Sequence, residues 1–225
     1  MNVNLKIRRQ SSECDSPWLQ EYHIDAQPNW SILDCLQEIS RRLDASLAYR
    51  ENCFSAVCGE CGVLANGKET LACANKINDF PLDAAGVIRV DLLPLRNHVL
   101  VRDLVVDRES HFQRLTIAGD VFCSTGHHEL IAGEAMREIQ TVTACLNCGL
   151  CDSSCPVEAE RGVFLGPAAL VWALRFALDP RDGERGVRRG VLDSPRGLSG
   201  CIDCGACSEV CPAGVPVHHL LKSAR

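Results

Sequence analysis

The second half of the chain repeats one cysteine pattern, in CLNCGLCDSSCP at residues 145–156 and in CIDCGACSEVCP at residues 201–212. Each segment has the spacing C-x2-C-x2-C-x3-C-P, which is typical of bacterial ferredoxins. In that arrangement three cysteines of a run bind one [4Fe-4S] cluster and the fourth binds the other. The pattern therefore predicts two [4Fe-4S] clusters with crossed ligands. One set is Cys145, Cys148, Cys151 and Cys211, and the other is Cys155, Cys201, Cys204 and Cys207.

A third group of cysteines lies in the first half, in YRENCFSAVCGECGVLANGKETLAC at residues 49–73. Cys53, Cys58 and Cys61 have C-x4-C-x2-C spacing, and Cys73 follows after a predicted hairpin. This is the plant-type pattern for a [2Fe-2S] cluster. Glycines in the loop let backbone amides approach the sulfurs, which favours their negative charge. These four cysteines are therefore the predicted ligands of a [2Fe-2S] cluster.

Disulfides and zinc are the alternatives for a chain with 15 cysteines. A domain of this size needs no covalent staples, and the amino terminus has no apolar run of the kind that marks a secretory signal. We therefore expect a cytoplasmic protein with reduced thiols. Zinc sites use C-x2-C pairs, and the first group offers only Cys58 and Cys61. Cys35 is expected in the core, and Cys14 and Cys123 have no predicted role.

Charge and hydropathy exclude two classes of partner. The net charge of -6 offers no electrostatic surface for nucleic acid. The most apolar stretch, residues 165–178, contains Gly166, Pro167 and Arg175 and is too short to cross a bilayer. Any attachment to a membrane is therefore expected to come through another subunit.

Hydrophobic patterning predicts an α+β protein of two domains. Strands are expected at residues 3–7, 18–26, 60–64, 68–71 and 87–93, with a helix that begins after Ser31. These elements predict a plant-type ferredoxin (β-grasp) domain at residues 1–94. Residues 95–225 are predicted to form an all-α, bacterial-ferredoxin-like domain with two clusters. Its expected helical segments include residues 99–105, 133–143 and 167–178, and residues 179–195 are expected to be an exposed, arginine-rich connection.

Three one-electron centres transfer electrons but offer no site for two-electron organic chemistry. The sequence contains no G-x-G-x-x-G fingerprint and no context for a Ser-His-Asp or Cys-His site. Catalysis is therefore expected on a partner subunit. The histidines are not expected to be ligands, because the cysteines complete each set. They are His23, His98, His111, His127, His128, His218 and His219.

The order of these domains resembles the iron-sulfur subunit of the succinate dehydrogenase and fumarate reductase family. Two further stretches strengthen the resemblance, LPLRNHVLVRDLVVD at residues 93–107 and FLGPAALVWALRFALDPRD at residues 164–182. The family implies an oxidoreductase complex in which an FAD-containing flavoprotein subunit interconverts succinate and fumarate, as in respiration and the tricarboxylic acid cycle. Electrons pass between the flavin, the [2Fe-2S] cluster, the middle cluster and the last cluster. The resemblance also implies a peripheral position at the inner face of the cell membrane, through a membrane-anchor or other electron-exchanging subunit.

The sequence departs from the common members in two places. Their third cluster is [3Fe-4S], because the second position of the last run is not cysteine, whereas Cys204 stands here and implies [4Fe-4S] with a lower potential. Their quinone site uses a Trp shortly after the Pro of the second run and a His after the first Cys of the third. Here these places hold Val157-Glu158-Ala159-Glu160 and Ile202. A different anchor, or a non-quinone partner such as a thiol-linked subunit, therefore stays open.

Three interpretations follow for the function. The first is the electron-transfer subunit of a succinate dehydrogenase or fumarate reductase type complex. The second keeps this role but gives the flavoprotein another substrate, and the copurifying flavoprotein distinguishes the two. The third is a freestanding electron carrier or metal-storing module, which isolation as a monomer with all clusters intact would favour.

Overall fold

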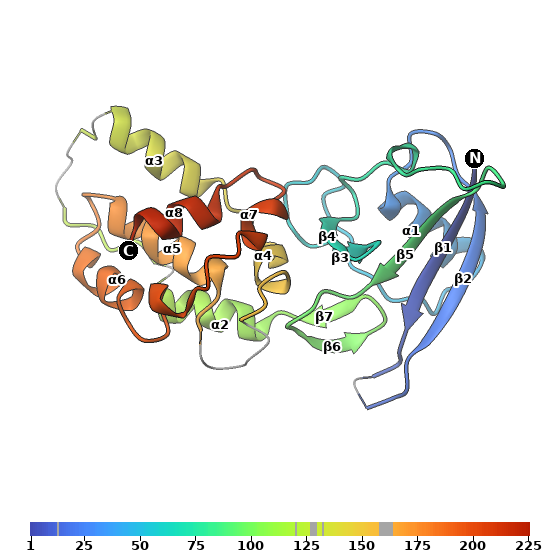
Figure 1. Ribbon diagram of the computed structural model, residues 1–225, viewed down its shortest axis with the longest axis horizontal. Coiled ribbons are helices and arrows are strands. Elements are labelled where there is room, and N and C mark those ends of the chain that lie inside the picture. The colour runs from blue at the N-terminus through green and yellow to red at the C-terminus, as the bar shows by residue number, and fades with distance from the viewer. Residues whose placement is uncertain (13, 120, 127–129, 132, 158–163) are drawn as a thin grey trace. The chain divides into compact units, whose positions relative to one another are not determined.

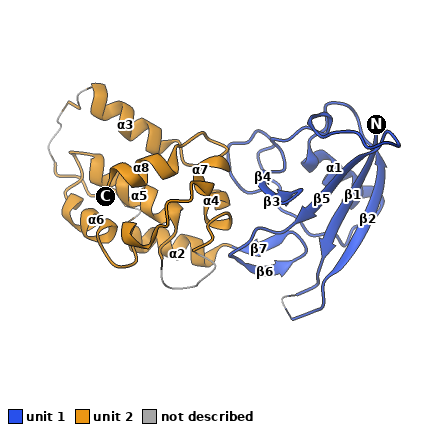
Figure 2. Ribbon diagram, viewed as in Figure 1, with its two compact units in different colours: residues 1–107 blue, residues 108–225 orange. Residues whose placement is uncertain are grey.

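The structure is a computed structural model that describes residues 1–12, 14–119, 121–126, 130–131, 133–157 and 164–225. The chain forms two compact units, Met1–Asp107 and Arg108–Arg225 (Figure 2). Strands dominate the first unit and helices the second (Figure 1). The predicted α+β class is therefore confirmed.

Unit 1 is built on a five-stranded mixed sheet of order β2-β1-β5-β3-β4. Its strands are β1 (Asn2–Arg9), β2 (Trp18–Asp25), β3 (Gly62–Ala65), β4 (Lys68–Leu71) and β5 (Ile88–Leu93). β1 runs antiparallel to β2 and parallel to β5, and β5 runs antiparallel to β3. Alternate side chains of β1 (Val3, Leu5, Ile7) and of β5 (Ile88, Val90, Leu92) are buried, because successive residues of a strand face opposite sides.

Helix α1 (Ile32–Arg42) begins where the sequence predicts it. The backbone N–H of Asp34 donates to Ser31 Oγ (3.2 Å), and the N–H of Ser31 donates to the Asp34 carboxylate (2.7 Å). This reciprocal capping box satisfies two amides at the helix start. The apolar face of the helix is buried, including the fully buried Cys35, which confirms that cysteine as a core residue. A short 3-10 turn, Ile77–Asp79, follows β4.

The prediction of a helical segment at residues 99–105 is wrong. β6 (Val99–Arg102) and β7 (Val105–Asp107) form an antiparallel hairpin instead. Asp103 takes a left-handed conformation (φ 48°) at its turn, and its carboxylate accepts the backbone N–H groups of Gln10 and Ala48, both at 2.9 Å. These long-range bonds fix a turn that local periodicity does not reveal. The hairpin therefore belongs to unit 1, and the compact units divide after Asp107 rather than at the predicted 94/95 boundary.

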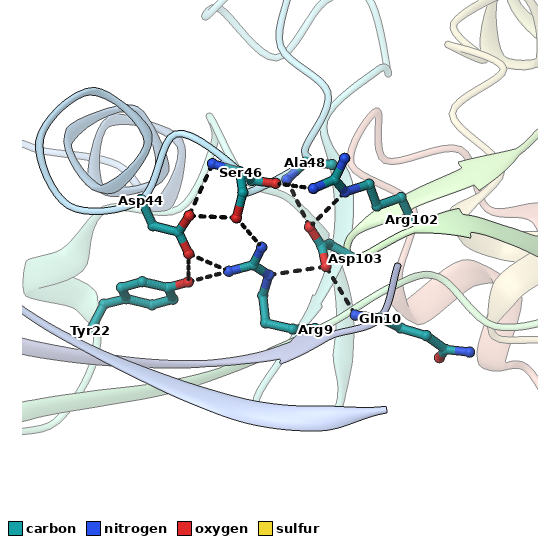
Figure 3. A network of polar contacts seen from close by, with 8 residues as sticks. All are labelled: Arg9, Gln10, Tyr22, Asp44, Ser46, Ala48, Arg102 and Asp103. Atoms are coloured by element: carbon teal, nitrogen blue, oxygen red, sulfur yellow. Dashed lines mark hydrogen bonds and ion pairs between the residues drawn. The ribbon is translucent and has the colours of Figure 1, made fainter. Parts of the chain in front are cut away.

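A buried ion-pair network holds this hairpin in unit 1 (Figure 3). Arg9 pairs with Asp44 at 2.6 Å and with Asp103 at 3.0 Å, and its side chain is 4% exposed. It also donates to Tyr22 Oη and to Ser46 Oγ. Hydrogen bonds from Ser46, Tyr22 and Arg9 hold the pKa of Asp44 well below its usual range. Arg9 thus has two carboxylate partners, and Arg102, 3.7 Å from Asp103, adds a second positive charge, so the buried charges are paired.

The regular elements of unit 2 in its described residues are helices, joined by turns and loops, with one isolated β-bridge between Ser124 and Asp182. Its helices are α2 (Glu109–Ala118), α3 (Gly133–Thr143), α4 (Leu150–Ser153), α5 (Pro167–Leu178), α6 (Arg185–Leu192), α7 (Ala206–Glu209) and α8 (Val217–Ser223), with a 3-10 turn at Leu198–Gly200. The predictions for residues 133–143 and 167–178 are confirmed. α5 contributes more residues to the core than any other helix of this unit and packs against α2, α3, α6 and α8. Within the described residues, no helix is long and apolar enough to cross a membrane.

The prediction that residues 179–195 form an exposed connection is also wrong, because they contain α6. Arg188 is 4% exposed. It pairs with Glu184 at 3.3 Å and Asp182 at 3.7 Å, and donates to the carbonyl of Val121 at 2.6 Å. These partners compensate the buried charge, so an arginine-rich segment packs into unit 2.

Candidate iron-sulfur sites

The first cysteine group lies in a loop of unit 1 that precedes β3, with its last member just after β4. Cys53 Sγ lies 3.4 Å from the backbone nitrogens of Ser55, Val57 and Cys58. Hydrogen bonds from these amides lower the pKa of Cys53 to about 6. The loop therefore favours a thiolate at its first predicted ligand, as iron coordination requires.

Two further thiols of this group, those of Cys73 and Cys61, accept backbone amides. The N–H of Ala56 points to Cys73 Sγ at 3.2 Å, and the N–H of Cys73 points to Cys61 Sγ at 3.5 Å. Phe54 and Ala56 have left-handed backbones (φ 57° and 56°), which turn the chain so that its amides face the sulfurs. Burial raises the pKa of Cys61 to about 12. Its deprotonation therefore needs a nearby positive charge, which iron supplies.

A second set of thiols surrounds an apolar cavity of unit 2, called here the middle cavity. Cys145, Cys148, Cys151 and Cys211 line it. The rest of its wall includes Leu146, Ala168, Val171, Val215 and Val217. Burial raises the pKa of Cys148 to about 12 and raises that of Cys145 and Cys151 as well. Four thiols, one buried and three partly buried, with few other polar groups fit a cationic cluster that would hold them as thiolates.

A third set surrounds a second apolar cavity of unit 2, called here the outer cavity. Cys155, Cys201, Cys204 and Cys207 line it. Val157, Phe164, Pro167, Ile202, Gly205, His218 and Leu221 complete its wall. Burial raises the pKa of Cys207 to about 12, whereas Cys204 is exposed. Ile202 is 62% exposed, so this cavity lies at the surface of unit 2.

The composition of both cavities matches the crossed sets expected from the sequence. Each cavity combines three cysteines of one run with the fourth cysteine of the other. The short helices α4 and α7, one in each run, contact one another. No three His, Cys, Asp or Glu side chains of the described residues converge closely enough to hold a single metal ion. Each thiolate of a [4Fe-4S] cluster binds a different iron, so the four sulfurs need not converge on one point.

Polar residues around the middle cavity were not predicted. Asn147, between two of its cysteines, has a left-handed backbone (φ 53°). Its side-chain oxygen accepts the indole N–H of Trp172, and its carbonyl accepts a hydrogen bond from Arg108. These donors come from α5 and from the residue before α2. The spacing of the cysteines does not indicate these donors.

A buried carboxylate next to Cys151 supports the loop of the middle cavity. Asp152 follows Cys151 and is 1% exposed. It bonds His111 Nδ1 at 2.7 Å and Arg114 at 3.3 Å, and it accepts the backbone N–H of Ala168 at 3.0 Å near the start of α5. Burial alone favours the neutral acid, yet the hydrogen bond from His111 and the charge of Arg114 lower the pKa of Asp152 to about 2. The carboxylate therefore ties α2, α4 and α5 together in its ionised form.

The loop of the outer cavity has charged partners instead. Asp203 has a left-handed backbone (φ 62°), and its carboxylate contacts His218 Nε2 and an Arg225 nitrogen, each at 3.0 Å. Arg225 also donates to the carbonyl of Cys201 at 2.7 Å and to that of Leu198 at 3.3 Å. The sequence predicted no role at this site for either partner of Asp203.

The other residues of interest fall outside these sites or outside the described residues. Cys14 is exposed, and Cys123 is partly exposed, with its sulfur 3.9 Å from the carbonyl of Val121. His127 and His128 lie outside the described residues, as does the departure at Glu158, Ala159 and Glu160. His111 is fully buried and bonded to Asp152.

Two family models match the chain. A 2Fe-2S iron-sulfur cluster binding domain matches residues 4–113, and a 4Fe-4S dicluster domain matches residues 141–215. The chain therefore has a [2Fe-2S] domain followed by a [4Fe-4S] domain, in the order that the sequence predicts.

Known proteins match over nearly the whole chain. The fumarate reductase iron-sulfur subunit of Haemophilus influenzae is 34% identical and aligns with 95% of this chain and 88% of its own length. The subunit of the same name from Mycobacterium tuberculosis is also 34% identical, over 95% and 87%. A subunit of the fumarate reductase (CoM/CoB) of Methanothermobacter marburgensis is 32% identical over 93% of this chain but 41% of its own length.

A solved structure shares the fold. A chain of the Mycobacterium smegmatis Sdh1 complex in the apo form superposes with a TM-score of 0.88 at 23% identity, over 99% of this chain and 93% of that one. At 23% identity this similarity shows the fold, while the two cluster domains and the relatives that match over nearly the whole chain show the family. The chain belongs to the family of iron-sulfur subunits that transfer electrons in succinate dehydrogenase and fumarate reductase type oxidoreductase complexes, beside a flavoprotein subunit.

Proposed function

We propose that this subunit passes electrons between an FAD-containing flavoprotein and a second electron-exchanging subunit through three clusters, each held by four cysteines. One observation carries the proposal: the twelve predicted ligands form three separate sets of four, one in a loop of unit 1 and two around cavities of unit 2. Bound iron-sulfur clusters supply one-electron transfer. The chain contributes thiolates, amides directed at sulfur, and apolar walls.

In detail, Cys53, Cys58, Cys61 and Cys73 hold the [2Fe-2S] cluster. The sheet order, with β1 and β5 parallel at its centre, supports a β-grasp assignment for this domain. The middle cavity holds a [4Fe-4S] cluster, on Cys145, Cys148, Cys151 and Cys211.

The outer cavity holds a third cluster, which we assign as [4Fe-4S] rather than [3Fe-4S]. Cys204 lines the cavity together with Cys155, Cys201 and Cys207, so a fourth thiolate is available. The potential depends on the type of cluster, and we expect a lower value for [4Fe-4S] at this site than for [3Fe-4S]. The subunit therefore suits a more reducing donor or a weaker acceptor than its common relatives do.

For the reaction of the complex, we propose succinate and fumarate interconversion at the flavoprotein subunit. Relatives named for fumarate reductase at 34% identity over nearly the whole chain support this substrate pair. We propose a position at the cytoplasmic face of the cell membrane, reached through a membrane-anchor or other partner subunit, as the family implies.

A second candidate keeps the architecture but replaces the quinone by a thiol-type electron partner. Ile202 occupies the position after Cys201. The quinone-linked members of the family that this sequence resembles have histidine there. The Methanothermobacter relative is named for the CoM/CoB pair, which favours this candidate. The copurifying subunits, and the compound that the purified complex oxidises or reduces, distinguish the two candidates.

Electron paramagnetic resonance of the purified complex tests the cluster assignment. Spectra are recorded as isolated and after dithionite reduction, with iron and acid-labile sulfide quantified. We expect one [2Fe-2S] and two interacting [4Fe-4S] centres on reduction, and no strong [3Fe-4S] signal when oxidised. Cys204→Ser should change the third centre alone. A strong oxidised [3Fe-4S] signal that survives anaerobic purification contradicts the role of Cys204.

A further inference from the structure

The loop that carries Cys201 and Cys204 is the exposed wall of the outer cavity. Ile202 is 62% exposed, and Asp203 and Cys204 are exposed. The N–H of Cys201 donates to the carbonyl of Leu198 (3.2 Å), and the chain then continues to Gly205 without helix or strand. A loop of this kind needs side-chain contacts to hold two thiols at fixed positions.

Arg225 supplies contacts on both sides of Ile202. One guanidinium nitrogen donates to the carbonyl of Cys201 at 2.7 Å and to that of Leu198 at 3.3 Å. Another donates to the Asp203 carboxylate at 3.0 Å. The planar guanidinium presents several donors in fixed directions, so a single side chain spans the loop.

His218 completes the arrangement from α8. Its Nε2 lies 3.0 Å from the second oxygen of Asp203, and its backbone N–H donates to Ser208 Oγ at 2.8 Å, beside Cys207. A carboxylate only accepts hydrogen bonds, so Nε2 carries the proton. Asp203 is thus fixed by two donors, although aspartate in a left-handed conformation costs more than glycine.

We propose that Arg225, acting through Asp203 and the two carbonyls, is the positioning residue of the third cluster: it fixes the loop of Cys201 and Cys204 and sets the local charge. This inference rests on the proposed ligand set of the outer cavity. A cation beside a cluster favours its reduced, more negative form, and an anion opposes it. Arg225 and Asp203 therefore act on the potential of the third cluster with opposite signs.

Redox titration of the assembled complex, followed by electron paramagnetic resonance, tests this role. Arg225→Gln removes the cation and should lower the midpoint potential of the third cluster. Asp203→Asn removes the anion, keeps a side chain that tolerates the left-handed backbone, and should raise it. The potentials of the other two clusters should stay unchanged. Arg225→Lys, which keeps the charge but loses the planar set of donors, should restore part of the wild-type potential.

The matched control is Arg189→Gln. Arg189 pairs with Asp193 at 2.9 Å in an exposed i,i+4 ion pair of α6. This variant should leave all three potentials unchanged.

The outcomes separate the two proposals. Shifts of the same sign in Arg225→Gln and Asp203→Asn, or no shift in either, overturn the role of Arg225 while the third cluster stays assigned. If Arg225→Gln loses the third cluster altogether, the upward shift in Asp203→Asn is still required. A third centre that Cys204→Ser leaves unchanged overturns the ligand set itself.

Discussion

The loops at residues 145–148 and 201–204 have the same cysteine spacing and the same backbone turn, yet they lie in different surroundings. The third residue of each loop is left-handed, with φ 53° at Asn147 and 62° at Asp203. Each loop is followed by a left-handed glycine, Gly149 (φ 75°) and Gly205 (φ 81°), which begins a short helix. Aspartate and asparagine tolerate this conformation better than other side chains with a Cβ.

The partners of the two turn residues differ. In the middle loop, Asn147 receives the indole N–H of Trp172 and a bond from Arg108, and Cys148 is buried. In the outer loop, Asp203 is fixed by charged Arg225 and by His218, and Cys204 is exposed. The repeated spacing thus determines the backbone conformation of each loop. The surrounding side chains determine the charge next to each cluster site and its access to solvent. Four predictions test this division.

Loss of the crossing cysteine from either cavity should produce the largest effect. Cys211 lies in the last run but lines the middle cavity, and Cys155 lies in the earlier run but lines the outer one. Cys211→Ser should therefore deplete the middle cluster, and Cys155→Ser the third, each with a loss of iron and sulfide. Electron paramagnetic resonance and iron analysis of both variants measure this. Cys14→Ser, at an exposed position, is the control. Loss of the third cluster in Cys211→Ser would refute the crossing.

Loss of the buried carboxylate of Asp152 should produce the second largest effect. Asp152→Asn removes the charge that faces His111 and Arg114, at a site that is 1% exposed. Removal of one partner from a buried ion pair typically costs about 3–5 kcal/mol. The urea midpoint of unit 2, followed anaerobically by cluster absorbance, should fall by about 1 M or more.

The matched control for this variant is Asp193→Asn, which removes the exposed partner of Arg189. Its midpoint should move little, because exposed ion pairs contribute little to stability. Equal midpoints for the two variants would mean that Asp152 does not support the middle loop.

The fold could be predicted wherever local chemistry decides it. The start of α1 after Ser31 and the hairpin of β3 and β4 depend on neighbouring residues and were predicted. The hairpin of β6 and β7 was missed, because the turn at Asp103 depends on the backbones of Gln10 and Ala48, far away in the sequence.

A similar limit applies to α6 and to the sites. Local sequence predicts a surface position for Arg188, whereas in the fold Asp182, Glu184 and the carbonyl of Val121 surround it. The candidate ligands follow from spacing alone, because a cluster needs thiols at set intervals. Their supporting partners, such as Trp172 and Arg225, stand in other helices or beyond them, so only the tertiary structure shows them.

The neutral anchor of the middle loop should give a smaller effect than Asp152. Trp172→Phe keeps the aromatic contact with Arg175, whose guanidinium lies 4.7 Å from the ring, but removes the indole N–H that Asn147 accepts. One hydrogen bond lost at a partly buried site costs about 1–2 kcal/mol. The urea midpoint of unit 2 should fall accordingly, and the spectrum of the middle cluster should change while that of the third does not. Trp18→Phe, on the exposed start of β2, is the control. A change confined to the third cluster would mean that Trp172 does not support the middle loop.

Salt should produce the smallest effect, and only in the outer loop. The screening length falls from about 10 Å at 0.1 M to about 3 Å at 1 M salt. The exposed contact between Asp203 and Arg225 weakens under these conditions, whereas the hydrogen bond from Trp172 to Asn147 carries no net charge. Iron loss from the third cluster to a chelator should therefore accelerate about twofold in 1 M NaCl, as expected for an exposed ion pair, and that from the middle cluster should not. Arg225→Gln should already lose iron at the faster rate in 0.1 M NaCl and should respond little to added salt. An equal response of both clusters would contradict this difference, because the charged donor of the middle loop, Arg108, is 7% exposed and bonds a carbonyl rather than a carboxylate.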